Sequence, residues 1–382
     1  MSFVIFISIV LLVYFLANTY IFIRGWQALS GAAALRPAYL VAFIVLFLSF
    51  IIGRILMNVS PGFFSSMMIW IGSFWLACMF YFFLFVLLLD IVRLFNIWFH
   101  FFPAAHTVRY ETAKLITLLS ALVIVAGAVI SGYVNASTVH IRTLELNISK
   151  KAGTLSELNL VMASDIHLGT IIGRKSLCSI VEKINSLHPD IVILAGDVVD
   201  EDINPVIRNN LGEMLRSIRS KYGVYAIPGN HEYIGGAEKA FRYLKEHDII
   251  VLRDSVVCID SAFQLAGRED RDKKRFTGAA RKELSELLAP LDRSLPVILL
   301  DHQPFAFDRT VEAGVDLQLS GHTHNGQMWP LNYITGAIYE KDWGYLKKGN
   351  AQFYISCGAG TWGPPVRIGN RPEIVQIRIK FQ

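Results

Sequence analysis

The chain has 382 residues, of which 53% are hydrophobic, and a formal net charge of +5. So high an apolar fraction excludes a single ordinary soluble domain and indicates a membrane part. Residues 1–139 hold six Lys or Arg and two acids, which leaves 30 basic and 29 acidic residues for the remainder. A near-neutral C-terminal part lacks the basic face that nucleic-acid binding requires, so no nucleic-acid partner is expected.

Four apolar segments precede residue 140. Each is long enough for a membrane-spanning helix, which needs roughly 20 residues. They are Phe3–Ile23, Pro37–Met57, Met67–Leu89 and Ala113–Val134. The first lacks the basic region and the cleavage site of a signal peptide, so it is predicted to be a true span. Residues 1–139 are therefore expected to form a four-helix transmembrane anchor.

The loops between these spans indicate an orientation. Loops one and three carry Arg24, Arg36, Arg93, Arg109 and Lys114, whereas the opposite side carries Arg54, Arg142, Lys150 and Lys151. Because positive residues prefer the cytoplasmic side, an extracytoplasmic C-terminal domain is favoured. Near the end of the third span, Asp90 and Arg93 stand one helical turn apart. They fit an interfacial pair at a helix end better than a transport pathway, so the helices are expected to anchor the protein.

Residues 140–157 are expected to be a linker, and residues 158–382 a second domain. In that domain short β-rich runs such as LNLVMAS and IVILAGD alternate with helical patterns, among them residues 205–219 and 279–288. Polar residues come directly after several predicted strands, namely Asp165, Asp197, Asn230 with His231, His302, and His322 with His324. Ligand sites in open α/β sheets lie at such strand ends, so these side chains are expected to gather at one rim. A buried polar cluster must be paired, and metal ions are natural partners.

The residue types suit metal ligation. Asp165 and His167 stand two apart in ASDIHLG, so on an extended strand end they point to the same side. Asp197 has two carboxylate oxygens and is able to bridge two ions, and Asn230 offers a carbonyl oxygen. His302, His322 and His324 offer imidazoles. Oxygen and nitrogen donors without cysteine suit Mn, Fe or Zn, fit Ca poorly, and are unlike a structural zinc site.

The motifs DxH, GD, GNHE, a lone His and GHTHNGQ, in this order, resemble those of the calcineurin-like metallophosphoesterases. With the apolar N-terminal part, the chain is similar to the membrane-associated bacterial branch of that superfamily, which implies a bacterial cell membrane. The resemblance covers Leu158 to the C-terminus. It implies a four-layer α/β domain in which two β-sheets pack face to face between helices.

The resemblance also implies a binuclear centre of two divalent ions, Mn first, with Fe or Zn as alternatives. One ion would be held by Asp165, His167, Asp197 and His324, and the other by Asp197, Asn230, His302 and His322. Asp197 would bridge them. His231 matches the histidine that contacts the phosphate and assists the leaving oxygen, so His231, Asp197 and Asn230 are the expected catalytic residues.

The expected function is metal-dependent hydrolysis of a phosphoester, as the resemblance implies. Two ions polarise the phosphoryl oxygens and lower the pKa of a bridging water, which then attacks as hydroxide. Because the anchor restricts the domain to the membrane surface, a phosphodiester or pyrophosphate in a lipid or cell-envelope substrate is expected. A UDP-diacylglucosamine-type glycolipid, the substrate of one activity in the resembling branch, fits an extracytoplasmic domain poorly. A phosphomonoesterase acting on a small molecule and a membrane signalling protein that binds through the metal fold stay as alternatives.

Residues 328–349, after the last candidate ligand, mix aromatic residues with lysines. The aromatic residues are Trp329, Tyr333, Tyr339, Trp343 and Tyr345. Such a mixture is typical of a lipid interface. Aromatic side chains that pack as a lid on the sheet explain the same pattern, and both interpretations are open at this point.

Overall fold

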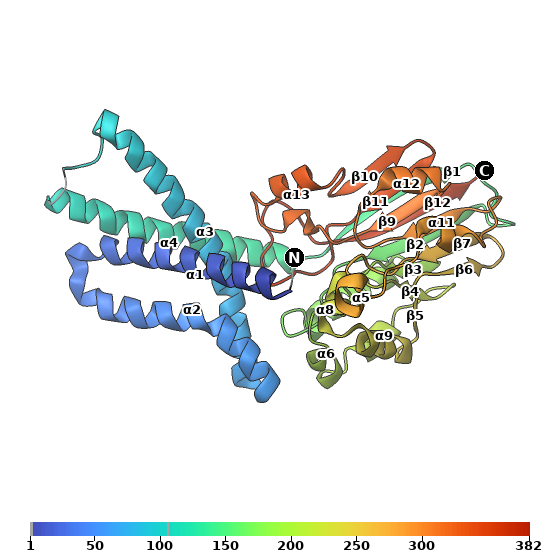
Figure 1. Cartoon of the computed structure of the whole chain (residues 1–382), viewed down its shortest axis with the longest axis horizontal. Coiled ribbons are helices and arrows are strands. Elements are labelled where there is room, and N and C mark those ends of the chain that lie inside the picture. The colour runs from blue at the N-terminus through green and yellow to red at the C-terminus, as the bar shows by residue number, and fades with distance from the viewer. Residues whose placement is uncertain (1–2, 105–106) are drawn as a thin grey trace. The chain divides into compact units, whose positions relative to one another are not determined.

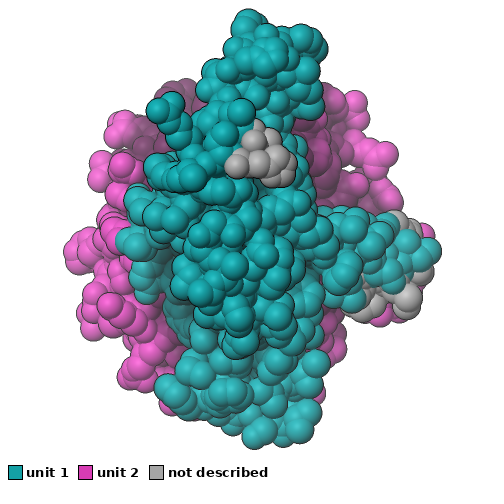
Figure 2. Space-filling view, turned by 90° about the vertical axis from the view of Figure 1, so that its left-hand side faces the viewer, with its two compact units in different colours: residues 1–133, 363–366 teal, residues 134–362, 367–382 magenta. Residues whose placement is uncertain are grey.

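The computed structural model describes residues 3–104 and 107–382, and the chain divides into two compact units (Figures 1 and 2). Unit 1 comprises residues 1–133 and 363–366, and unit 2 comprises residues 134–362 and 367–382. Strand β1 (His140–Ile148) and the other strands of the described chain all belong to unit 2.

Four long helices make up most of unit 1 (Figure 1): α1 (Phe3–Ala28), α2 (Arg36–Val59), α3 (Phe63–Phe99) and α4 (Val108–Ala136). A short 3-10 helix, η1 (Ser30–Leu35), joins α1 to α2. All four long helices are apolar and long enough to cross a membrane, as the sequence predicts. Each extends beyond its predicted span, and α3 extends furthest, so Asp90 and Arg93 lie inside the helix rather than at its end.

Helices α2 and α3 approach closely because glycines lie at their contact. A Cβ at Gly72 would stand 2.4 Å from the backbone of Phe50, and one at Gly53 would stand 2.7 Å from the backbone nitrogen of Ile69. Small residues let helix backbones approach in this way, and close packing is a main source of helix association in membranes. The glycines therefore fix how α2 packs on α3.

Unit 2 contains two six-stranded sheets. The first has the order β1-β12-β2-β3-β4-β5, with β2 (Glu157–Ala163), β3 (Ile191–Leu194), β4 (Val224–Ala226), β5 (Ile249–Val251) and β12 (Glu373–Phe381). The second has the order β10-β11-β9-β8-β7-β6, with β6 (Ser255–Ile259), β7 (Phe263–Gly267), β8 (Val297–Leu300), β9 (Leu317–Ser320), β10 (Gly344–Lys348) and β11 (Ala351–Ile355).

The sheets pack face to face because alternate residues of their strands are apolar on both sides. Leu158, Leu160 and Met162 of β2 share one buried cluster with residues of β8 and β9 in the second sheet. Val161 and Ala163, which point to the opposite face of β2, share another cluster with the helices. Strands that are buried on both faces explain the nearly continuous apolar runs in the sequence.

Helices cover the outer face of each sheet. On the first sheet these are α5 (Arg174–Ser186), α7 (Gly212–Arg216) and α9 (Ala237–Glu246). On the second they are α11 (Leu284–Leu288) and α12 (Phe307–Glu312). Further short helices are α6 (Asn204–Arg208), α8 (Asn230–Gly235), α10 (Lys273–Thr277), η2 (His324–Gly326) and α13 (Asn332–Ile338). The helix–sheet–sheet–helix order confirms the four-layer prediction.

The structure differs from the sequence predictions at three places. Residues 140–148, expected within a linker, form β1, which pairs in parallel with β12 at the sheet edge. The helix expected around residues 205–219 is divided into α6 and α7, because the chain turns at Asn210, where φ is 49°. The helix expected from residue 279 begins only at Leu284, since the preceding segment is held by tertiary contacts such as Arg281 Nη1 to Asp301 Oδ1 at 2.8 Å.

Strand direction gathers the loops that matter for function. Strands β2, β3 and β4 run parallel in the first sheet, and β8 and β9 run parallel in the second. The carboxyl ends of parallel strands lie at one edge of their sheet. The loops after these five strands carry all the candidate ligands of the sequence analysis.

The layer between the sheets should dominate the stability of unit 2. Ile193 of β3 is fully buried in this layer, whereas Ile250 of β5 is 46% exposed. We expect Ile193→Ala to lower the free energy of unfolding by about 2–5 kcal/mol, because it leaves a cavity. Ile250→Ala should lower it by less than about 1 kcal/mol. Denaturant unfolding of the detergent-solubilised protein compares the two, and equal losses would contradict the assigned core.

Candidate metal centre

Five loops deliver the candidate ligands to one place. Asp165 and His167 follow β2, and Asp197 follows β3. Asn230 opens α8 shortly after β4, His302 follows β8, and both His322 and His324 follow β9. The structure brings all seven of these predicted residues together, and six of the seven are buried, with His322 partly buried.

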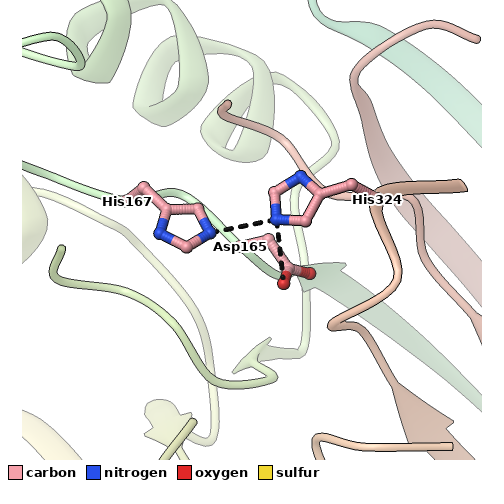
Figure 3. Close-up of side chains that lie close together, drawn as sticks. All are labelled: Asp165, His167 and His324. Carbon is pink, nitrogen blue, oxygen red and sulfur yellow. Dashed lines mark hydrogen bonds and ion pairs between the residues drawn. The ribbon is translucent and has the colours of Figure 1, made fainter. Parts of the chain in front are cut away.

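Asp165, His167 and His324 form a first group (Figure 3). The Nε2 atoms of His167 and His324 are 3.0 Å apart, and His324 Nε2 lies 3.5 Å from Asp165 Oδ1. Figure 3 shows the two imidazole rings turned toward each other above the carboxylate. The donor atoms of three side chains thus converge on one point, as in the ligand set of an ion.

Asp197, His302 and His322 form a second group. His302 Nε2 lies 3.1 Å from Asp197 Oδ2, and His322 Nδ1 lies 2.8 Å from Asn230 Oδ1. Asp197 Oδ2 is also 3.9 Å from His167 Nε2 of the first group. The carboxylate of Asp197 therefore lies between the two groups.

Several buried polar atoms of these groups have no hydrogen-bond partner in the described part of the chain. They include Asp165 Oδ2 and His167 Nδ1, whereas His302 Nε2 has the carboxylate of Asp197 as a close neighbour. Nearly all buried polar atoms in native proteins are hydrogen-bonded, so several unpaired atoms at one place need an explanation, such as a bound ion or water. Oxygen and imidazole donors that are buried, convergent and unpaired fit divalent metal ions.

The electrostatics of the cluster favour the ligating forms of two histidines. Burial lowers the pKa of His322 to about 3 and holds the pKa of His324 well below its usual range. Both rings are therefore neutral at physiological pH, and the neutral imidazole is the form that binds metals. Burial alone would raise the pKa of Asp197, but the imidazoles of His302 and His231 outweigh it and keep the carboxylate ionised.

The backbone at the cluster is strained. Five of the seven residues have positive φ angles between 48° and 75°, namely Asp165, His167, Asp197, His322 and His324. Residues other than glycine avoid this region, and each such residue costs on the order of 1–3 kcal/mol unless the surroundings enforce it. Strain of this kind concentrates at functional sites, where it aims side chains that regular strands would point elsewhere.

Glycine is required where the chain crowds these side chains. A Cβ at Gly229 would stand 2.1 Å from Asp197 Oδ1, and a Cβ at Gly321 would stand 2.3 Å from Asp165 Oδ2. The glycines of GNHE and GHTH therefore have a steric reason, beyond ordinary turn formation, to lie beside the candidate ligands.

His231 borders the cluster without belonging to either of these two groups. Its backbone N–H donates to Asp197 Oδ1 at 2.9 Å, and its ring stands perpendicular to that of His167 with 4.6 Å between centroids. On another side, its ring centroid is 5.5 Å from that of Trp362, which is half exposed. Burial opposes protonation of His231, but Asp197 and Asp200 outweigh it and raise its pKa to about 9.

Asp200 is a further candidate site residue that the sequence analysis missed. Its Oδ1 lies 3.2 Å from His231 Nδ1 and 3.7 Å from His167 Nδ1, so one carboxylate faces the outer nitrogens of two site histidines. A carboxylate behind a metal-binding histidine fixes the tautomer and the orientation of the ring. Its place in AGDVVD, three residues after Asp197, was the available signal.

Glu232 and Arg367 were also missed. The buried carboxylate of Glu232 accepts hydrogen bonds from the backbone nitrogens of Asp197, Val199 and Gly229, and so ties two site loops together. Glu232 lies within GNHE, but the motif did not reveal this role.

The guanidinium of Arg367 is fully buried and donates to the carbonyls of Cys357 and Gly360, at 2.7 Å from the first. Its Nη2 also lies 3.3 Å from His324 Nδ1. Arg367 therefore supports His324 although it lies 43 residues later in the sequence, and no local sequence pattern predicts this contact.

Comparisons with known proteins support this reading of the fold. A family model described as calcineurin-like phosphoesterase matches residues 158–326. An uncharacterized metallophosphoesterase of Helicobacter pylori is 34% identical over 58% of this chain and 60% of its own length. An Aquifex aeolicus metallophosphoesterase is 33% identical over 63% of this chain and 94% of its own length. A Bos taurus transmembrane protein with a metallophosphoesterase domain is 32% identical over 70% of this chain. The chain spans 60% of the Helicobacter protein and 63% of the bovine one.

Asp200→Asn tests whether the carboxylate supports metal binding. Loss of a group that orients metal-binding histidines weakens metal affinity about 10–100-fold. We therefore expect Asp200→Asn to weaken Mn²⁺ binding by that factor, measured as metal content after equilibrium dialysis at graded Mn²⁺ concentrations.

Asp202→Asn is the matched control, because its carboxylate lies in the same loop and accepts a hydrogen bond from Asn204 N. It should leave the affinity unchanged. Equal Mn²⁺ affinity in wild type and both variants would contradict the supporting role of Asp200.

Proposed function

Since the chain belongs to the calcineurin-like phosphoesterase family, we propose that it is a membrane-anchored hydrolase that cleaves a phosphodiester or pyrophosphate bond with two divalent metal ions. The observation that carries this proposal is the convergence of seven buried or partly buried donor residues, some with unpaired atoms, on a strained backbone. Ordinary packing gives no reason for such a cluster.

We assign the ligands as the sequence motifs suggest. One ion would be held by Asp165, His167, Asp197 and His324, and the other by Asp197, Asn230, His302 and His322. The position of the Asp197 carboxylate between the two groups supports its bridging role. When bound, the ions polarise the phosphoryl oxygens and make a water nucleophilic. The donor types suit Mn, Fe or Zn alike, and we propose Mn first because the family resemblance implies it.

The residues of the chain then supply positioning and a proton. His231 would face the leaving oxygen and donate to it, because Asp197 and Asp200 favour its protonated form. Asn230 and Asp197 would contribute to catalysis by positioning other groups. The amide oxygen of Asn230 lies at hydrogen-bonding distance from His322 Nδ1, and the Asp197 carboxylate accepts a hydrogen bond from the backbone N–H of His231. Trp362 borders His231 and would limit access of water from that side.

We propose a lipid or other cell-envelope phosphoester as substrate. Helix α13 has no buried residue and begins eight residues after His324. On it and just before it, Trp329, Tyr333, Ile334 and Ile338 are each at least 50% exposed. Apolar side chains exposed together beside a polar site favour a ligand with an apolar part.

Other residues of the same segment fit the lid interpretation instead. The Tyr339 ring packs on that of Phe305 at 4.8 Å between centroids, and Trp343 Nε1 donates to Glu373. The segment therefore combines packed aromatics with an exposed apolar face, and only the exposed face supports contact with lipid.

Hydrolysis of model substrates tests the reaction type. With Mn²⁺, the detergent-solubilised protein should cleave bis(p-nitrophenyl) phosphate faster than p-nitrophenyl phosphate. Asp197→Asn keeps the shape of the side chain but removes its charge, so we expect a more than about hundredfold lower rate, beyond the effect of losing a supporting group.

Asp202→Asn serves again as the control and should keep the wild-type rate. Faster cleavage of the monoester would contradict the phosphodiesterase proposal and favour a phosphomonoesterase. Absence of hydrolysis of both compounds by protein with two bound metal ions would contradict the enzymatic proposal and favour a binding role in signalling.

The orientation of unit 2 is proposed to be extracytoplasmic in a bacterial cell membrane, on the distribution of basic residues among the loops of unit 1. Two native thiols of unit 2, Cys178 and Cys258, are exposed, whereas Cys357 is buried. A membrane-impermeant maleimide should therefore label Cys178 and Cys258 in spheroplasts.

The Cys178→Ser, Cys258→Ser double variant should lose this labelling. Labelling that occurs only in inverted membrane vesicles would contradict this orientation and place unit 2 on the cytoplasmic side. A substrate on the cytoplasmic leaflet would then be the better candidate.

A further inference from the structure

The helices of unit 1 line a partly open cavity of about 760 Å³, and the proposed hydrolysis does not involve it. Its volume lies in the range of roughly 300–1,000 Å³ that small-molecule sites occupy. All four long helices contribute to its lining, which is therefore a feature of the tertiary fold and not of one helix surface.

The lining has a basic end and an apolar wall. Arg24, Arg36, Arg93 and Lys114 line the basic end. These residues lie at the end of the bundle where α1 is joined to α2 and α3 to α4, whereas α4 ends at the opposite end. The apolar wall includes Phe43, Trp75, Phe82 and Leu122. Such a lining fits an amphiphile with a negatively charged head and an apolar tail.

The charges at the basic end are not balanced by the carboxylates that pair with them. Arg24 Nη2 lies 2.5 Å from Asp90 Oδ2, and Arg93 Nη1 lies 3.7 Å from Oδ1 of the same residue. Lys114 pairs with Glu111 at 2.7 Å. Four cations therefore meet two carboxylates, which leaves about two positive charges beside an apolar wall. Uncompensated charge in such surroundings is unfavourable, and an anionic ligand would compensate it.

Arg36 is the basic residue best placed for a ligand. Its Nη2 donates to the backbone carbonyl of Trp26 at 3.2 Å, and its guanidinium lies over the Trp26 ring. Its Nε is buried and has no hydrogen-bond partner among the described residues. Because a guanidinium presents a planar fork of donors that matches phosphate, the unpaired Nε makes Arg36 a candidate contact for a phosphate group.

The cavity borders the lipid-facing surface of the bundle. Ala42 and Leu122 line it, and both are exposed on the outside of their helices. A tail that enters beside these residues would remain continuous with the surrounding lipid. This access favours a membrane lipid over a soluble anion, because a soluble anion has no apolar part that would contact the apolar wall.

We propose that this cavity binds one anionic phospholipid, with the phosphate at Arg24, Arg36, Arg93 and Lys114 and one acyl chain along the apolar wall. The proposal is independent of the hydrolytic function. The distribution of positive charge that orients membrane proteins explains basic residues in these loops, but it does not require them to line a cavity. Arg109 is exposed in the same part of the bundle but does not line the cavity. A substitution of Arg109 therefore changes the loop charge without changing the proposed lipid site.

Native mass spectrometry of the full-length protein tests the proposal, with phosphatidylglycerol and phosphatidylcholine of identical acyl chains as probes. One phosphatidylglycerol should be retained in preference to phosphatidylcholine. Arg36→Gln should weaken phosphatidylglycerol binding about fivefold, since one basic residue contributes about 1 kcal/mol to attraction of an anionic lipid. Ala42→Trp should reduce retention at least as much by filling the cavity without a change of charge.

Arg109→Gln is the matched control and should change the affinity less than twofold. Equal effects of Arg36→Gln and Arg109→Gln, or equal retention of the two lipids, would overturn the proposal in favour of general surface charge. Glycerol 3-phosphate should not displace the lipid at equal concentration, and displacement would assign the site to a soluble anion. Unchanged thermal unfolding of each variant excludes misfolding as the cause of lost binding.

Discussion

Unit 2 depends on one constraint, which is that its polar side chains are buried in a cluster whose hydrogen-bonding atoms are not all paired with one another. Two carboxylates, an amide and four imidazoles lie at the edge of two apolar sheets, and several of their atoms have no partner among the described residues. Desolvation of such groups is unfavourable by several kcal/mol each unless they are paired. The remaining polar features of the domain serve this cluster. Asp200 faces two of its imidazoles, Glu232 joins two of its loops, and Arg367 lies behind His324.

The rigidity that this constraint demands comes from the two-sheet core. Residues on both faces of β2 and β3 are fully buried, so the ends of these strands have little freedom. That stiffness allows Asp165, His167 and Asp197 to be held with positive φ, a conformation that an isolated loop would leave. The packing energy of the apolar layers thus maintains the strain that aims the ligands. The geometry of the candidate site and the stability of unit 2 therefore depend on the same apolar packing.

The same electrostatic constraint applies in unit 1, where the surroundings are lipid. Asp90, inside α3, accepts hydrogen bonds from Tyr20 and Arg24 of α1, both at 2.5 Å. Asp90 and Arg93, which the sequence analysis treated as a pair within one helix, therefore belong to a polar cluster that joins α1 and α3. In unit 2 metal cations would compensate an excess of ligand atoms, and in unit 1 a lipid phosphate would compensate an excess of cations. Compensation by a bound group, rather than by further side chains, is what makes a buried charged cluster a site.

The sequence by itself determined the four apolar helices, the four layers of unit 2 and the identity of the residues that converge. The helices and the converging residues follow from local information, since apolar length and polar residues at strand ends are visible without the fold. The four layers were implied by the resemblance of the motif order to a known family, not by local patterns. Only the tertiary structure decided that His140–Ile148 pairs with the C-terminal strand, because β-pairing joins residues distant in sequence. It also decided which groups stand behind the ligands. Arg367 lies 43 residues beyond His324, and Arg24 lies 66 residues before Asp90. Contacts of that range depend on how sheets and helices pack, so no local spacing encodes them.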